Sequence, residues 1–396
     1  MDANGLDNRS ALRVIVYGGD LAALETALAL ERLCGDRCEV TLLTPVRDLP
    51  VRTHAAGAPP AEGRPARFDL GALASEHGIA FRSDAIVAVD DQAREARTIT
   101  GTRLPFDALV IAFGARPRGA IPGATTCWGI GDAEALDCML DELLSGSIAS
   151  IAFAVPRRLR WTLPTYELAL TTARRARAAG VTGAKLSLVT YEGRAVELLG
   201  ADAEQAITAR LAAADIELVT EREPVAFAEG SLVLNPEGSV AVDRAVSLPV
   251  VEGPRIGGLP RDADGFLPVD AFGRVQGAQR IWAAGEVTSF PVRQAGIAAQ
   301  QALVVAASIA AEAGVTVTTE PFRPVLRGLL RSEHQEAANG NGAASTLWWP
   351  PEQLAGEHLS AHIGTKLVVT PPSGYDTIPV AVELGPDGRR IAGAPS

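Results

Sequence analysis

A short apolar run that ends at a glycine pair constrains the fold of this chain more than any other feature. Residues 12–17 (LRVIVY) are typical of a buried strand, and residues 21–33, rich in Ala and Leu, are typical of a helix. Residues 38–43 (CEVTLL) predict a second strand. A strand, a helix and a strand within about 30 residues form a βαβ unit, which implies a parallel sheet.

The same alternation continues along most of the chain and predicts the fold class. We expect an α/β protein with two Rossmann-like (βαβ) domains, each with a parallel sheet, plus a small C-terminal segment. Further strands are predicted at 108–112, 149–155, 186–190 and 281–284, and further helices at 133–145, 165–179, 202–214 and 295–312. The expected divisions are 1–120 (first domain, first part), 121–255 (second domain), 256–325 (first domain, second part) and 326–396 (C-terminal segment with a flexible connector and tail).

Charge and cysteine content exclude some classes of partner. The 396 residues include 36 Lys and Arg against 47 Asp and Glu, a net charge of −11, so binding to nucleic acid is not expected. The most apolar stretch, 295–311, contains Gln300 and Gln301, so no transmembrane helix is predicted, and membrane contact has only weak support in a C-terminal tryptophan pair. Four cysteines do not make a disulfide framework, which favours a cytoplasmic protein. His358 and His362 have no third partner nearby, so no metal site is expected.

The glycine turn after the first strand has the properties of a pyrophosphate site. Gly18 and Gly19 allow a tight turn, and the small Ala22 and Ala23 let the helix pack close to the sheet, so that its N-terminal N–H groups can face an anion. Asp20 stands where a third glycine normally lets the backbone approach phosphate, and its carboxylate would repel the ligand unless it turned away. Thr44 ends the second strand, where an acid would hold the ribose hydroxyls.

Two distant motifs complete the pattern. Residues 112–115 (AFGA) follow a predicted strand, and residues 281–287 (IWAAGEV) are followed by residues 290–296 (FPVRQAG) and a helix. Over residues 12–325 this order resembles the flavoproteins with two dinucleotide-binding domains, in particular the branch of sulfide:quinone oxidoreductase and type II NADH dehydrogenase. The resemblance implies FAD as cofactor, with the ribityl chain near the Gly285–Glu286 stretch and the flavin pyrimidine edge at the N-terminus of the last helix. The residues expected to bind it are Gly18, Gly19, Asp20, Ala22, Ala23, Thr44, Arg52, Ala112, Gly114, Gly285, Glu286, Gln294, Ala295 and Gly296.

Two charged residues are candidates for catalysis. Arg293 precedes the last helix and would stabilise a reduced, anionic flavin; the alternative is a surface residue at a helix start. Glu167, in the expected first turn of a helix near Pro164, matches a glutamate that faces the flavin ring in related proteins and could relay protons; the alternative is an acid that complements the helix dipole.

The second half lacks what a nicotinamide cofactor needs. No glycine occurs between Gly146 and Gly180, so the backbone after strand 149–155 cannot close on a second pyrophosphate. The arginines of that stretch, Arg157, Arg158 and Arg160, either attract an anionic substrate or form a solvated loop. The four cysteines are interpreted as small buried apolar residues, which argues against sulfide oxidation by a cysteine pair; they are Cys34, Cys38, Cys127 and Cys138.

We therefore expect an FAD-dependent oxidoreductase that passes electrons from an unidentified small-molecule donor, which could be anionic, to quinone or another acceptor. Departures at Asp20, Thr44 and Glu286 support an alternative, a flavin-free paralogue that serves as a binding or regulatory partner. A further alternative is an NAD(P)H-dependent reductase. The aromatic pair at 348–349 would suit a homodimer contact.

Overall fold

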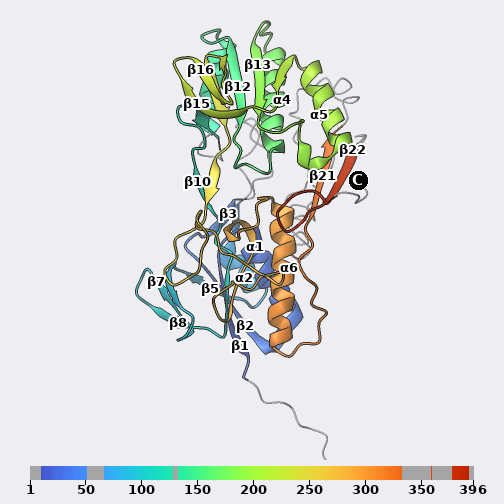
Figure 1. The fold of residues 1–396 in the computed structure, drawn as a ribbon. Coiled ribbons are helices and arrows are strands. Elements are labelled where there is room, and N and C mark those ends of the chain that lie inside the picture. Colours follow the sequence, from blue (N-terminus) through green and yellow to red (C-terminus); the bar gives the residue numbers. More distant parts are fainter. Residues whose placement is uncertain (1–9, 51–66, 128–132, 332–357, 359–376, 392–396) are drawn as a thin grey trace, which may run out of the picture.

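The computed structural model describes residues 10–50, 67–127, 133–331, 358 and 377–391, which form two α/β lobes (Figure 1). Arg52, the predicted connector and the tryptophan pair lie outside these residues. The predicted βαβ unit is present as β1 (Leu12–Tyr17), α1 (Leu21–Cys34) and β2 (Cys38–Thr44). β1 and β2 pair in parallel, so the prediction from the apolar run and the glycine turn is confirmed.

The first lobe is built on a five-stranded parallel sheet with the order β20-β9-β1-β2-β5. On one face, α1 packs against α6, and on the other lies a small antiparallel sheet of β6, β7 and β8 (Figure 1). The bounds are β5 (Ala80–Ser83), β6 (Ile86–Asp90), β7 (Glu95–Thr98), β8 (Arg103–Pro105), β9 (Ala108–Ile111), β20 (Ile281–Ala283), α2 (Leu70–Glu76), α6 (Ala295–Glu312), β3 (Asp48–Pro50) and β4 (Arg67–Asp69), the last two forming an antiparallel pair.

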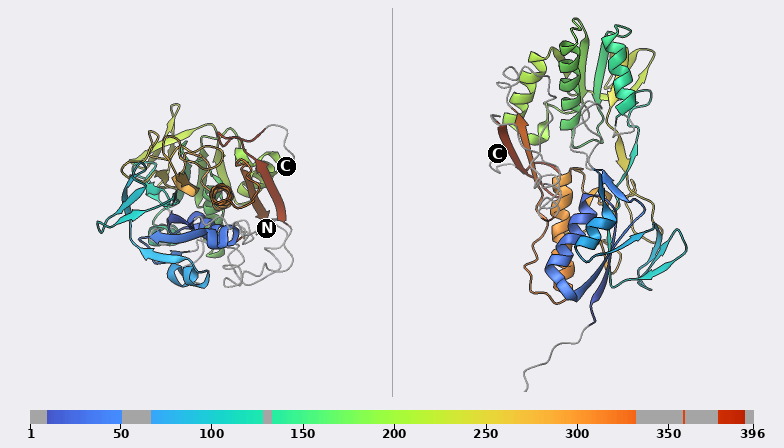
Figure 2. Two further views of the ribbon diagram at one scale, coloured as in Figure 1. Left: turned by 90° about the horizontal axis from the view of Figure 1, so that it is seen from below. Right: turned by 180° about the vertical axis from the view of Figure 1, so that it is seen from behind.

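The second lobe repeats this plan with a five-stranded parallel sheet, β11-β18-β12-β13-β14. Helices α3, α4 and α5 cover one face, and an antiparallel sheet of β15, β16 and β17 covers the other (Figure 2). The bounds are β11 (Thr125–Thr126), α3 (Ala133–Leu144), β12 (Ser150–Val155), α4 (Leu163–Ala178), β13 (Lys185–Thr190), α5 (Ala201–Ala213), β14 (Ile216–Val219), β15 (Glu223–Ala228), β16 (Ser231–Asn235), β17 (Ser239–Ala241) and β18 (Arg244–Ser247).

Two crossing strands connect the lobes. β10 (Arg116–Arg118) leads out of the first lobe and pairs in antiparallel fashion with β19 (Val250–Glu252), which leads back. β21 (Val325–Arg331) and β22 (Thr377–Glu383) form an antiparallel pair near the C-terminus, and Leu326 and Val382 join the hydrophobic core of the second lobe.

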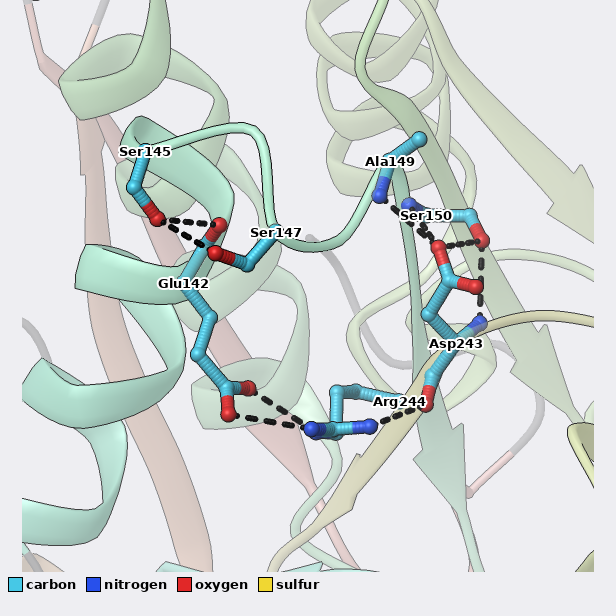
Figure 3. A network of polar contacts seen from close by, with 7 residues as sticks. All are labelled: Glu142, Ser145, Ser147, Ala149, Ser150, Asp243 and Arg244. Carbon is cyan, nitrogen blue, oxygen red and sulfur yellow. Dashed lines mark hydrogen bonds and ion pairs between the residues drawn. The ribbon is translucent and has the colours of Figure 1, made fainter.

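The amino end of the second sheet is fastened by a polar network (Figure 3). One oxygen of Asp243 accepts hydrogen bonds from the backbone N–H groups of Ala149 and Ser150 at 2.8 and 2.9 Å, and from the Ser150 hydroxyl. Arg244 donates two hydrogen bonds to the Glu142 carboxylate on α3, at 2.9 and 3.0 Å. These contacts hold the starts of β12 and β18 against the end of α3. The network therefore lies at the amino edge of the sheet and not at its carboxyl edge.

Helix α6 is the one helix, within the described part of the chain, that is long and apolar enough to cross a membrane by length and composition. Its residues Ala302, Val305, Ala306 and Ile309 are buried in the core of the first lobe, where α6 packs against α1. Burial in that core accounts for its apolar composition.

Candidate functional site

Three sequence motifs far apart in the chain meet at the carboxyl edge of the first sheet. A Cβ added at Gly18 would lie 2.2 Å from the Ala112 carbonyl oxygen and 3.0 Å from the Ala23 Cβ. A Cβ added at Gly285 would lie 2.8 Å from the Ala22 Cβ, in the first turn of α1. The turns after β1, β9 and β20 therefore form one close-packed backbone cradle, in which any larger side chain would collide.

Asp20 occupies the centre of this cradle. It is the N-cap residue of α1, and its Oδ1 accepts a hydrogen bond of 3.3 Å from the backbone N–H of Ala23. Its Oδ2 lies 3.0 Å, and Glu286 Oε2 lies 3.8 Å, from the point where Gly114 would carry a Cβ. The two carboxyl groups thus converge beside Gly114, and both residues are partly exposed. We name the space next to these three residues the recess.

The surroundings of Asp20 disfavour its charged form. Loss of water around the carboxyl group, with a contribution from the nearby Glu286 carboxylate, raises the pKa of Asp20 to about 7. Backbone hydrogen bonds at the start of α1 oppose this rise. At neutral pH the side chain is therefore divided between neutral and ionised forms.

The start of α6 is also capped by its own chain. Gln294 is the N-cap residue, and its Oε1 accepts a 2.9 Å hydrogen bond from the backbone N–H of Ile297. Ala295 and Gly296, which begin the helix, are partly exposed. The predicted site residues at this helix start are thus in place beside the cradle, because a Cβ at Gly285 would also lie 3.8 Å from Ala298 in the same turn.

Gln301 fixes the turn that carries Glu286, a role that the motif analysis did not assign. The backbone N–H of Gly285 donates to Gln301 Oε1 at 2.8 Å, and Gln301 Nε2 donates to the Thr288 hydroxyl at 3.2 Å. That hydroxyl donates in turn to the Gly285 carbonyl at 2.9 Å. Gln301 is buried on α6, so only the packing of α6 against this turn reveals the contact.

Arg293 is turned toward its own loop. Its Nη1 donates to the carbonyl oxygens of Thr288, at 3.0 Å, and Phe290, and its Cζ lies 4.0 Å from the centroid of the Phe266 ring. Burial lowers the pKa of Arg293 to about 10, while Glu286 acts in the opposite direction. The guanidinium therefore stays charged at neutral pH and offsets part of the negative charge of Glu286.

Thr44 is fully buried at the end of β2. Its hydroxyl accepts a 3.3 Å hydrogen bond from the backbone N–H of Val46 and lies 2.5 Å from the place of a Cβ on Gly19. Thr44 therefore stabilises the loop after β2 and packs under the glycine turn.

A buried acid, Glu192, lies at the carboxyl edge of the second sheet, just after β13. Its carboxylate accepts hydrogen bonds from the hydroxyls of Tyr166, Thr190 and Thr162, at 2.8, 2.9 and 3.0 Å, and from the backbone N–H of Glu197 at 3.1 Å. Burial raises the pKa of Glu192, and these hydrogen bonds oppose the rise. Thr162 is the N-cap residue of α4, but its hydroxyl donates to Glu192 and makes no capping hydrogen bond to the helix.

The other predicted site residues in the second lobe are buried or form ion pairs. Glu167 is buried and is the fifth residue of α4, so it lies just beyond the first turn in which it was expected. Arg157 pairs with Glu223 at 3.1 Å and Arg158 pairs with Asp264, which binds the arginine stretch to acids of this chain.

The cysteines do not form a uniform set. Cys34 and Cys127 are buried, Cys38 is partly exposed and Cys138 is exposed, so the expectation that all four are buried was wrong for Cys38 and Cys138. Cys138 lies on the solvent side of α3, an amphipathic helix. In the described part of the chain, no group of three or more His, Cys, Asp or Glu side chains could hold a metal ion.

One family of known proteins matches part of this chain. Residues 167–302 match the model of the pyridine nucleotide-disulphide oxidoreductases. Over these residues the chain resembles the pyridine nucleotide-disulphide oxidoreductases. The predicted family resemblance, the α/β fold class and the assignment to the oxidoreductases are confirmed. No protein of curated function matches the chain in sequence.

Solved structures share the fold at low identity. The sulfide:quinone oxidoreductase of the hyperthermophilic bacterium Aquifex aeolicus aligns with a TM-score of 0.68 and 18% identity over 81% of each chain. A ferredoxin reductase from Rhodopseudomonas palustris aligns with a TM-score of 0.61 and 18% identity, over 80% of this chain and 79% of that one. An NAD-dependent persulfide reductase from A. fulgidus aligns with a TM-score of 0.56 and 14% identity, over 81% of this chain and 68% of that one.

The backbone of the cradle fits a dinucleotide better than the side chain of Asp20 does. The backbone fits, because Gly18 lets the turn after β1 pack against Ala112, Gly285 lets the turn after β20 pack against the first turn of α1, and Gly114 has no side chain beside that turn. The side chain of Asp20 competes with it, since the N–H of Ala23 already has an acceptor and the carboxyl group projects beside Gly114.

Proposed function

We propose that this chain is an FAD-dependent oxidoreductase that passes electrons from a small-molecule donor to quinone or another acceptor. The observation that carries the proposal is the convergence of the turns after β1, β9 and β20 on the first turns of α1 and α6. FAD, when bound, would supply a centre that takes electrons from one substrate and gives them to another. The proposal of quinone as acceptor draws on the name of the Aquifex relative.

The residues of the recess would bind and orient the cofactor. Gly18 and Gly285 would hold the turns around it, Gly114 would let it approach the backbone, and the charge of Arg293 near Glu286 would reduce the negative potential of the recess. Glu167, a buried acid at the start of α4, is proposed as the group that moves protons. We propose a cytoplasmic protein with a small-molecule substrate. Its net charge of −11 argues against a nucleic-acid partner.

We propose that the electron donor is not NAD(P)H. In the second lobe, Glu192 stands just after β13, where a nucleotide-binding domain carries the acid that holds the ribose. Its oxygens accept four hydrogen bonds from the protein itself. Mixing NADH with the FAD-loaded protein without oxygen tests this: no bleaching of the flavin band supports it, and rapid bleaching contradicts it.

A second candidate, the flavin-free paralogue, is favoured by the hydrogen bond between Asp20 and Ala23, which satisfies the α1 terminus without a ligand. The visible spectrum of the protein, after incubation with FAD and gel filtration at pH 6, separates the two. Bound flavin absorbance supports the oxidoreductase. A protein that remains colourless supports the paralogue and contradicts our proposal.

A further inference from the structure

We propose that the carboxyl group of Asp20 takes the place on α1 that the pyrophosphate of a dinucleotide would occupy, and that it acts as a built-in competitor which sets the affinity for FAD. This inference rests on the proposed function, because it concerns the same recess. It is specific to this chain, because it depends on Asp20, an acid at the position where a glycine normally lets the backbone approach phosphate.

The geometry places the carboxyl group on the ligand side of the cradle. Oδ1 accepts the hydrogen bond of Ala23 N–H, one of the donors that a phosphate would use at a helix N-terminus. Oδ2 projects to within 3.0 Å of the Cβ position of Gly114, whose missing side chain provides the opening. A bound pyrophosphate and this carboxyl group therefore compete for the same donors and the same space.

The charges around Asp20 make the competition dependent on protonation. Glu286 approaches the same position beside Gly114 as Asp20 does, and Arg293 lies in electrostatic range of Glu286. Adding a dianionic pyrophosphate beside two carboxylates is unfavourable, whereas a neutral Asp20 can donate a hydrogen bond to a phosphate oxygen. The pKa of Asp20, about 7, places this change within the physiological range.

The experiment is a titration of FAD binding, followed by flavin fluorescence and calorimetry, between pH 6 and pH 9. If Asp20 must be neutral for binding, the dissociation constant of the unaltered protein rises about tenfold per pH unit above 7, or about 100-fold by pH 9. Asp20→Asn, which keeps an N-cap acceptor without a charge, removes this dependence. Asp20→Gly removes it as well and binds FAD most tightly.

Asp69→Asn is the matched control, because Asp69 caps α2 in the same lobe through a 2.9 Å hydrogen bond from Ala72 N–H. Its pH profile should follow that of the unaltered protein, and thermal unfolding checks that every variant is folded. Riboflavin, which has no phosphate, should bind with the same affinity to the unaltered protein and to Asp20→Gly.

Each outcome decides one of the two proposals. If the profiles of Asp20→Asn and Asp20→Gly follow that of the unaltered protein, the competitor role is wrong and the oxidoreductase proposal stands. If neither the unaltered protein at pH 6 nor Asp20→Gly at any pH binds FAD, the proposed function itself is wrong. Binding by Asp20→Gly alone supports the competitor role and identifies the natural chain as the flavin-free paralogue.

Discussion

Glu192 and Asp20 are both acids at the carboxyl edge of a parallel sheet, but their surroundings differ. Glu192 is buried and receives four hydrogen bonds, which compensate the loss of water around its charge. Asp20 accepts a hydrogen bond from Ala23 N–H and faces a second acid, Glu286. Glu192 therefore stabilises the fold, whereas burial and the neighbouring Glu286 disfavour the charged form of Asp20.

The hydrogen bond from the Tyr166 hydroxyl is the shortest of the four that Glu192 accepts, at 2.8 Å. Tyr166→Phe removes it and leaves a buried carboxylate oxygen with less compensation, so the free energy of unfolding should fall by about 2 kcal/mol in a urea titration. Tyr191→Phe is the control, because its half-buried hydroxyl donates to the Leu159 carbonyl and not to a buried carboxylate. An equal or larger loss in Tyr191→Phe would contradict the structural role of Glu192.

The raised pKa of Asp20 also predicts a pH dependence of stability in the ligand-free protein. Because the folded-state pKa of about 7 exceeds the ordinary value of 3.8, the folded state binds more protons between these values, and stability falls as pH rises from about 4 to about 7. In thermal unfolding, Asp20→Asn should lack this part of the pH dependence, which amounts to at most about 4 kcal/mol in the free energy of unfolding. The pKa of Asp69 is lowered, so Asp69→Asn should keep the slope and change stability below pH 4. A slope unchanged in Asp20→Asn would show that Asp20 does not titrate in this range.

At the scale of elements, the close approach of β1, β9 and α1 depends on one glycine. Gly18→Ala would place a Cβ 2.2 Å from the Ala112 carbonyl oxygen, which must move together with β9. We expect a loss of about 3 kcal/mol in the free energy of unfolding, measured with urea. In Gly193→Ala the nearest atom, Glu197 Oε2, is 3.7 Å away, so its change should stay within about 0.5 kcal/mol. Similar stabilities for the two variants would mean that the turn after β1 is not tightly packed.

At the scale of the whole molecule, one hydrophobic cluster joins the two lobes. It contains Leu163 and Tyr166 of α4, Phe290 and Ile297 around the start of α6, and Val382 of β22. Phe290 also packs edge-on against Phe322, with ring centroids 5.4 Å apart. The lobes therefore share part of their core, and we expect them to unfold together.

Phe290→Ala tests this expectation in a calorimeter. The variant should show one transition, with the free energy of unfolding of the entire chain lowered by about 3–5 kcal/mol. Val225→Ala, at a position 39% exposed, should leave the transition nearly unchanged. Two separate transitions, of which only one shifts in Phe290→Ala, would show that the lobes unfold independently.

Much of the architecture could be predicted from local patterns. The helix predicted at 295–312 is α6 with the same bounds, and the strand predicted at 12–17 is β1, because apolar periodicity and a glycine after the strand act over a few residues. The antiparallel sheets β6–β8 and β15–β17 were not predicted. Their strands are short and partly exposed, so the alternation in each is too brief to stand out.

The candidate site, too, could be predicted from local patterns only in part. The sequence by itself determined which turns carry glycine and that Asp20 interrupts the first of them, because both are properties of a few adjacent residues. Only the tertiary structure decided that the Asp20 carboxyl group points beside Gly114 toward Glu286, and that Gln301 holds the turn of Gly285. These contacts join residues that are far apart in the chain, and their energies depend on burial and distance, which no local pattern contains.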